Sequence, residues 1–233
     1  VYHSPGQSIY CGVYPANWRD LECDCPGTRF ECGFERAIRR AAGKAPMRET
    51  MASLLLHYCG FNGTEPVVDP MCGSGTFVIE AAEIAACLKP GRSRHFAFEQ
   101  LAGFDAAAWQ RLQSSGQTTT PTVRFFGSDR DAGAIRMSRA NAERAGVAAF
   151  TTFEQNAISN LTRPEGSPGL VIVNPPYGDR IGDKKLLLAL YDALGKTLLA
   201  RFTGWRIAII TNETALAAAT GLPFAKPGPT ILH

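Results

Sequence analysis

The chain has 233 residues, of which 45% are hydrophobic and 19% are charged, and this composition excludes disordered and fibrous proteins. Its apolar runs are much shorter than the roughly 20 residues that a membrane helix needs, and its first residues lack the pattern of a secretory signal. The net charge of +3 is compatible with a polyanionic partner but is too small to demonstrate one. We therefore expect a soluble, cytoplasmic α/β protein with no membrane partner.

In chain order we expect the following elements: a helix over 48–59, a strand over 65–69, a helix over 75–88, strands over 122–129 and 149–155 on either side of a helix over 131–146, a strand over 169–174, a helix over 183–202, a strand over 205–211 and a helix over 212–220. This alternation is typical of a doubly wound, mostly parallel sheet with helices on both faces. Between residues 88 and 122 we expect an insertion that carries aromatic residues and ends in a flexible surface loop.

Residues 1–44 differ from the rest, because they mix Pro, Gly, Cys and single aromatic residues without a sustained period. We interpret them as a connector or the remnant of a preceding module, and residues 45–233 as the α/β domain. The chain ends in "GPTILH", where a further strand would be needed to complete the sheet. The domain is therefore expected to lack its last strand.

Seven cysteines are present, an odd number that does not suit a secreted disulfide framework. Four of them lie within the first 32 residues: Cys11, Cys23, Cys25 and Cys32. One residue between Cys23 and Cys25 is fewer than paired ligands of structural zinc sites usually have, so we favour free cysteines over a metal site.

The first candidate site follows the strand over 65–69, in the sequence "VVDPMCGSGTFVIEAA". Ligands of such sheets bind at the carboxyl ends of the strands, and glycines that open a helix allow a backbone to approach a ligand closely. Gly73, Ser74 and Gly75 follow Asp69 but lack the Lys-Ser/Thr of a phosphate-binding loop, and Val78 replaces the third glycine of a dinucleotide site. An acidic residue before this turn suits a cationic or zwitterionic ligand, such as the amino-acid part of S-adenosylmethionine. A purely structural turn is the alternative.

Two more polar residues end neighbouring strands. Asp129 could accept the hydroxyls of a ribose, whereas Asp131, just before a helix, is more simply an N-cap. Asn156 follows the next strand, and its amide could pair with the edge of an adenine, although a turn residue is an equally good interpretation.

The fourth candidate is "IVNPPYGDRIGD", where an apolar strand runs into Asn174, Pro175, Pro176 and Tyr177. The prolines fix an extended backbone, so the chain leaves the sheet in one rigid shape. Asn174 and the carbonyl of Pro175 could accept hydrogen bonds from a planar amino group, and Tyr177 offers a face on which a base can stack. These residues predict a site that orients an exocyclic amine of a nucleobase for methyl transfer.

The motifs "DPMCGSGTFVIEAA", "GSDRD" and "IVNPPYGDRIGD" together resemble the class I S-adenosylmethionine-dependent RNA methyltransferases that carry THUMP domains. The likeness is greatest to the family of bacterial guanine-N2 methyltransferases of large-subunit (23S) ribosomal RNA, and it covers most of residues 44–228. It implies a Rossmann-like fold, S-adenosylmethionine as cofactor and ribosomal RNA as partner, with no obligatory protein partner. It implies that residues 1–44 hold only the tail of a THUMP-type module.

The resemblance also implies roles for individual residues. The cofactor would be bound by Thr50, Asp69, Pro70, Cys72, Gly73, Ser74, Gly75, Asp129 and Asn156, and the target amine by Asn174, Pro175, Pro176 and Tyr177.

Two alternatives stay open. One is a DNA adenine-N6 or cytosine-N4 amino-methyltransferase, which shares the "NPPY" motif, and the other is an RNA-binding unit that resembles a methyltransferase but has lost turnover. Basic residues could touch phosphates around the site, or could simply belong to a solvated face: Arg92, Arg94, His95, Arg180, Lys184 and Lys185.

Overall fold

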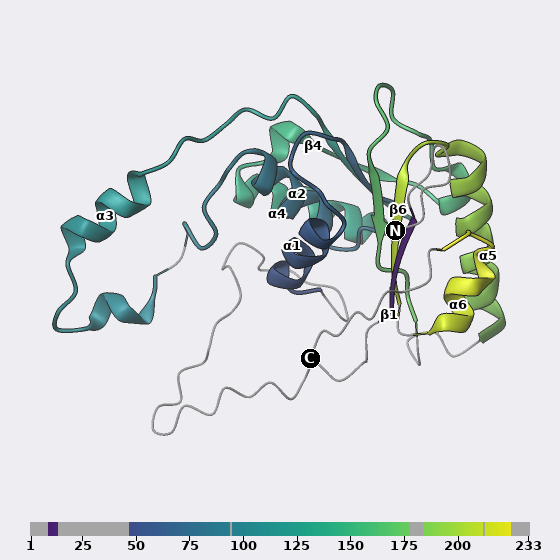
Figure 1. The fold of residues 1–233 in the computed structure, drawn as a ribbon, viewed down its shortest axis with the longest axis horizontal. Helices are drawn as coiled ribbons and strands as arrows, with labels where there is room; N and C mark the ends of the chain where they lie inside the picture. Colours follow the sequence, from purple (N-terminus) through teal and green to yellow (C-terminus); the bar gives the residue numbers. More distant parts are fainter. Residues whose placement is uncertain (1–8, 14–46, 94, 178–183, 212, 225–233) are drawn as a thin grey trace, which may run out of the picture.

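A six-stranded parallel sheet is the centre of the molecule, with the strand order β1-β6-β5-β2-β3-β4 (Figure 1). The computed structural model describes residues 47–93, 95–177, 184–211 and 213–224, together with the backbone of 9–13. The strands are β1 (Ile9–Val13), β2 (Val67–Asp69), β3 (Phe125–Asp129), β4 (Thr151–Gln155), β5 (Leu170–Val173) and β6 (Arg206–Thr211). The predicted doubly wound, Rossmann-like α/β fold is confirmed.

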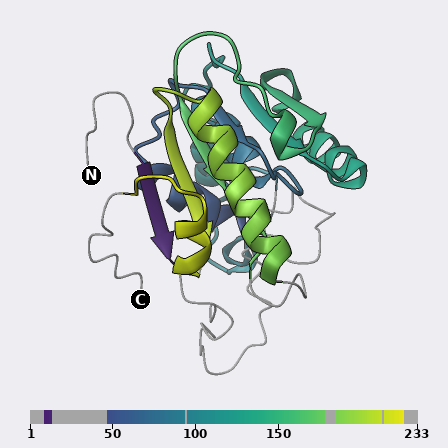
Figure 2. The ribbon, with the colours of Figure 1, turned by 90° about the vertical axis from the view of Figure 1, so that its right-hand side faces the viewer.

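Helices cover both faces of this sheet. They are α1 (Glu49–Tyr58), α2 (Thr76–Ala85), α3 (Ala106–Ser114), α4 (Ala132–Ala145), α5 (Lys184–Arg201) and α6 (Thr214–Ala219), with short 3-10 turns at Ala97–Gln100, Ala148–Phe150 and Ile158–Asn160. Helices α5 and α6 lie on one face, and α1, α2 and α4 lie on the other (Figures 1 and 2).

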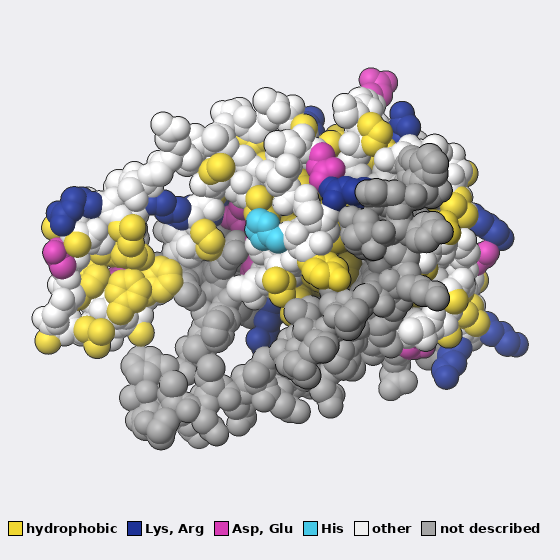
Figure 3. All heavy atoms as spheres, viewed as in Figure 1, with side chains coloured by type: hydrophobic (Ala, Val, Ile, Leu, Met, Phe, Trp, Pro, Cys, Tyr) yellow, Lys and Arg dark blue, Asp and Glu magenta, His cyan; other side chains and the backbone are white. Residues whose placement is uncertain are grey.

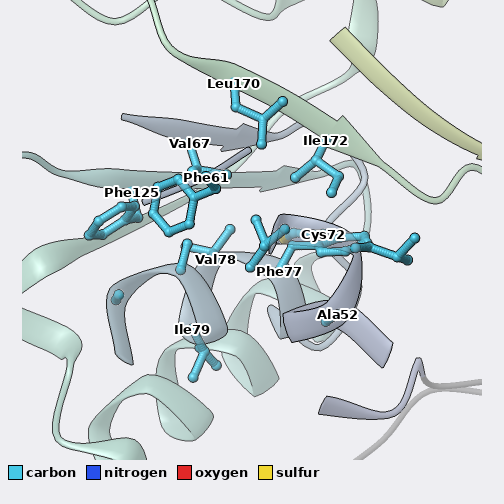
Figure 4. Close-up of a cluster of buried hydrophobic side chains, with 14 of the residues drawn as sticks. Ala52, Phe61, Val67, Cys72, Phe77, Val78, Ile79, Phe125, Leu170 and Ile172 are labelled. Carbon is cyan, nitrogen blue, oxygen red and sulfur yellow. The ribbon is translucent and has the colours of Figure 1, made fainter. Parts of the chain in front are cut away.

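Successive residues of the central strands alternate between two apolar clusters. In β5, Leu170 and Ile172 belong to the cluster under α1, α2 and α4, whereas Val171 and Val173 belong to the cluster under α5 and α6. Figure 4 shows Ile172 on the side of the sheet that faces Phe77 of α2. Because side chains alternate with period two, a strand buried on both faces reads as a continuous apolar run, and this is why "LVIV" lacks polar positions.

Strand β1 was not predicted. It comes from the segment expected to be a connector, and it pairs in parallel with β6 from Ile9↔Ile207 to Val13↔Thr211 at the edge of the sheet. Five residues among Pro, Gly and Cys give too short a pattern to reveal a strand, and the strand forms through its pairing with β6. The prediction that the sheet lacks its last strand concerns the end of the chain, and residues 225–233 lie outside the described residues.

The insertion also contains more regular structure than the sequence predicted. Helix α3 projects away from the sheet (Figure 1) and is supported by aromatic contacts, with the rings of Phe98 and Trp109 4.9 Å apart at 87°. Hydrophobic side chains gather on this part of the surface (Figure 3), and Leu101 and Leu112 are 65% and 59% exposed. The polar tract after α3 forms no helix or strand, as expected.

Candidate active site

The loops after β2, β3, β4 and β5 border one cavity of about 670 Å³. Carboxyl ends of parallel strands share one edge of the sheet, so four segments that are distant in sequence meet there. The lining residues are Met47, Asp69, Pro70, Met71, Cys72, Gly73, Ser74, Thr76, Phe77, Asp129, Arg130, Asn156, Ala157, Ile158, Asn174, Pro176, Leu186, Ala189 and Leu190. Four of the predicted site residues are not among them: Thr50, Gly75, Pro175 and Tyr177.

The glycine loop between β2 and α2 is tied to the end of β3. The N–H of Gly73 donates to Oδ2 of Asp129 at 3.0 Å. Gly75, the residue before α2, has φ +85°, and a Cβ at this position would lie 3.1 Å from the ring of Phe153. Position 75 therefore favours glycine for both its backbone conformation and its close contact with β4.

Asp69 is the most perturbed carboxyl group at the cavity. Only 2% of Asp69 is exposed, and its Oδ1 accepts a hydrogen bond from the N–H of Met71 at 3.1 Å. Burial raises the pKa of Asp69 from 3.8 to about 8; the bond from Met71 opposes this shift, and the charge of Asp129 adds to it. The carboxyl group is thus mainly protonated at neutral pH, and a cation placed beside it would favour its ionised form.

Asp129 organises the neighbouring loop as well as the glycine loop. Its Oδ1 accepts from the N–H of Asp131 at 2.9 Å, and its backbone carbonyl accepts from the N–H of Asn156 at 2.9 Å. Asp131 caps α4 by accepting from the N–H of Gly133 at 2.7 Å, which confirms the predicted N-cap. The ends of β2, β3 and β4 are therefore linked through one residue, by its carboxylate and its backbone carbonyl.

Asn174 lies where β5 ends, in the wall of the cavity. Its Oδ1 is buried and has no hydrogen-bond partner among the described residues. Pro175 beside it is buried, and Tyr177 packs against the apolar cluster under α5. This oxygen can therefore accept a hydrogen bond from a donor of a ligand in the cavity.

The sequence analysis missed the apolar part of the cavity wall. Leu186, Ala189 and Leu190 come from the start of α5, and their spacing of three and four residues, just after "NPPY", could have indicated a shared face. On the other side, Met47 lines the cavity, whereas Thr50 in α1 is exposed.

Two buried polar residues of α4 were also missed. Ser138 and Asn141 contact the glycine loop and interrupt the otherwise apolar buried stripe of their helix. The sequence did contain a signal for them: each is a polar residue at a position where the helical period requires an apolar one.

The predicted basic residues are partly engaged within the protein. Arg92 pairs with Glu83 at 2.6 Å, and His95 pairs with a carboxylate one turn further on at 3.0 Å. Lys184 and Lys185 are exposed at the start of α5. Arg94 and Arg180 lie outside the described residues.

Cys59, Cys72 and Cys87 are free cysteines, and Cys72 lies beside the cavity. Among the residues that the structure describes, no group of three or more His, Cys, Asp or Glu could hold a metal ion. The cysteines considered for zinc, Cys23, Cys25 and Cys32, are not described. Within the same ranges, no helix is long and apolar enough to cross a bilayer.

Residues 36–224 match a protein family described as "RMKL-like, methyltransferase domain". The chain is 42% identical, over 205 residues, to ribosomal RNA large subunit methyltransferase K/L of Chromohalobacter salexigens, and the match covers 82% of the chain but 28% of the relative. The crystal structure of SMU.472 complexed with SAH has 32% identity and a TM-score of 0.74, covering 81% of this chain and 49% of that one. A predicted N6-adenine-specific DNA methylase from Listeria monocytogenes has 31% identity and a TM-score of 0.76, covering 83% and 51%.

Proposed function

This chain belongs to the family of RMKL-like methyltransferase domains, and from that premise we propose that it transfers a methyl group from S-adenosylmethionine to guanine N2 in large-subunit (23S) ribosomal RNA. The chain spans little more than a quarter of the length of the curated relatives it matches, so the reaction and the RNA substrate are both part of the proposal. One observation carries it: the buried Oδ1 of Asn174 in the wall of the cavity, which has no hydrogen-bond partner in the part of the chain that the structure describes.

The order of the strands supports the assignment of the cofactor. Asn156, Asp129, Asp69 and Asn174 follow β4, β3, β2 and β5, which are consecutive neighbours in the sheet. Neighbouring strands lie about 4.8 Å apart, so these groups extend over roughly 14 Å. An elongated ligand with a base, a ribose and an amino-acid part would meet them in that order.

Each part of the cofactor has a proposed partner. The amide of Asn156 would pair with the edge of the adenine, Asp129 would accept hydrogen bonds from the ribose hydroxyls, and Asp69 would bind the ammonium group of the amino-acid part. The loop residues beside Asp69 would enclose the same part through their backbone: Pro70, Cys72, Gly73, Ser74 and Gly75. Thr50 in α1 is proposed to lie near this end of the cofactor.

The target amine would be held on the β5 side of the cavity. The bound cofactor supplies an electrophilic methyl group there. Asn174 Oδ1 and the backbone carbonyl of Pro175 would accept the two N–H groups of the amine, while Pro176 fixes the turn and Tyr177 stacks on the base. Holding both hydrogens would direct the nitrogen lone pair towards the methyl group, so catalysis comes from orientation and electrostatics.

The remaining assignments follow from this reaction. A ribosomal RNA substrate implies a cytoplasmic site of action. We also propose that residues 45–233 form the catalytic unit and that residues 1–44 are a connector or the remnant of a THUMP-type module, which contributes β1 to the edge of the sheet.

The test has two stages and uses the whole chain. Calorimetric titration should show micromolar binding of S-adenosylhomocysteine and no binding of NAD. The chain is then incubated with radiolabelled S-adenosylmethionine and either undermethylated 23S ribosomal RNA or duplex DNA, and the nucleosides are analysed by mass spectrometry. We expect N2-methylguanosine from the RNA. Methylated adenine or cytosine in the DNA would show that the proposed RNA substrate is wrong. Cofactor binding without any transfer would indicate a unit that has lost turnover.

A further inference from the structure

Helix α4 carries two polar residues on its buried face. Ser138 and Asn141 are both 0% exposed, and their neighbours in the buried stripe are Ala134, Ile135 and Ala142. Apolar residues would pack at these positions without any need for hydrogen-bond partners. The two buried side chains therefore need hydrogen-bond partners within the protein.

Both side chains donate to the glycine loop. The hydroxyl of Ser138 lies 2.7 Å from the carbonyl oxygen of Gly73, closer than its second acceptor, the carbonyl of Ala134 at 3.0 Å. Nδ2 of Asn141 lies 2.9 Å from the carbonyl oxygen of Ser74. Arg144 donates to Oδ1 of Asn141, which fixes the amide so that its NH₂ group faces the loop. Two consecutive carbonyls of the loop are thus held by side chains that lie more than 60 residues further along the chain.

The opposite side of the loop is held by β3. The N–H of Cys72 donates to the carbonyl of Ser128 at 2.9 Å, and the N–H of Gly73 donates to the carboxylate of Asp129 at 3.0 Å. In a planar trans peptide, the N–H and the C=O point in opposite directions. The bond from α4 to the Gly73 carbonyl therefore turns the N–H of the next residue, Ser74, away from α4.

We propose that Ser138 and Asn141 are positioning residues for the cofactor, an inference that rests on the proposed function. They keep the carbonyls of Gly73 and Ser74 directed towards α4, so that neither oxygen faces the carboxylate of the amino-acid part. A carbonyl that loses its buried donor would turn towards water, and Gly73 and Ser74 both line the cavity. The exposed oxygen would then repel the carboxylate.

Titration of Ser138→Ala and Asn141→Ala with S-adenosylhomocysteine tests this role. We expect Kd to rise about tenfold in each variant, which corresponds to a loss of about 1.4 kcal/mol of binding free energy. The stoichiometry should stay near one, because the folded fraction is retained. In the transfer assay, KM for S-adenosylmethionine should rise by the same factor, while kcat at saturating cofactor stays within about twofold.

Thr220→Val is the matched control. The Thr220 hydroxyl is also buried and donates to a helix carbonyl, that of Ala217 at 2.7 Å, but it lies at the end of α6 and does not line the cavity. This variant should lower Tm without changing Kd. If Ser138→Ala does not fold, Ser138→Cys, which keeps a weak donor and a similar shape, takes its place.

The outcomes separate this inference from the proposed function. Failure of the unmodified chain to bind S-adenosylhomocysteine would overturn the proposed function, and the positioning role with it. If the unmodified chain binds but the α4 variants show the same Kd and only a lower Tm, the two residues are structural and the inference is wrong. An equal rise of Kd in Thr220→Val would also overturn it, since general destabilisation would then explain the effect.

Discussion

Asp69 gives the sharpest prediction, because its buried carboxyl group has a pKa of about 8 in the ligand-free chain. If the ammonium group of the cofactor binds beside it, the nearby positive charge lowers that pKa, and the carboxyl group releases its proton. At pH 7 a group with a pKa of about 8 is roughly 90% protonated, so binding should release about 0.9 proton. At pH 8 the release should fall to about 0.5 proton.

Calorimetry measures this release directly. S-adenosylhomocysteine is titrated at pH 7 in two buffers of different ionisation enthalpy. The difference between the observed enthalpies, divided by the difference between the two ionisation enthalpies, gives the number of protons released. Because protonated Asp69 must ionise first, Kd should also fall roughly tenfold from pH 6 to pH 7 and level off above pH 8.

Asp69→Asn supplies the control, since the amide has nearly the same shape and cannot ionise. Its proton release should vanish, and its weaker affinity should not vary between pH 6 and pH 8. Stability depends on pH in the opposite direction to affinity. Because folding raises the pKa of this carboxyl group, the free energy of unfolding decreases as pH rises from about 4 to about 8. The variant should therefore exceed the parent in Tm at pH 8, with a smaller difference at pH 5. Equal proton release by the parent and the variant would refute the reasoning.

Three further substitutions test the rest of the site and the fold. Asn174→Ala should leave the Kd of S-adenosylhomocysteine within about threefold while the transfer rate falls about 100-fold or more, because only the reacting amine loses its acceptor. Asp129→Asn should raise that Kd, by about 1–3 kcal/mol in binding free energy, because it weakens an acceptor for the ribose and for the N–H of Gly73. Gly75→Ala should reduce the free energy of unfolding by about 2–4 kcal/mol in urea denaturation, since φ is +85° and the new Cβ would lie 3.1 Å from Phe153.

Each of these three predictions can be contradicted by a specific result. Equal losses of affinity and transfer rate in Asn174→Ala would contradict the role of Asn174 in holding the amine. An unchanged Kd in Asp129→Asn would show that Asp129 does not bind the cofactor. Gly146→Ala is matched to Gly75→Ala, because Gly146 also has a positive φ, +73°, but a Cβ there would meet nothing within 4 Å. It should cost only about 1 kcal/mol, and a loss as large as that of Gly75→Ala would show that packing against Phe153 is unimportant.

Local pattern was sufficient for most of the fold. The apolar run of β5, the periodic helix α4 and its N-cap Asp131 were each predicted from a few adjacent residues, because propensity, alternation and capping are short-range effects. Strand β1 and helix α3 were not predicted. The first depends on its pairing with β6, and the second depends on aromatic contacts such as that between Phe98 and Trp109.

The sequence by itself determined which chemistry the site can contain. An acid and glycines after one strand, an acid after the next and Asn-Pro-Pro-Tyr after a third are local motifs, and each can be recognised without knowledge of its neighbours. Only the tertiary structure decided which groups meet. Strand order makes β5 and β3 the two neighbours of β2, burial raises the pKa of Asp69, and α4 brings Ser138 and Asn141 to the glycine loop. These are consequences of packing between segments distant in sequence, and no local pattern encodes them.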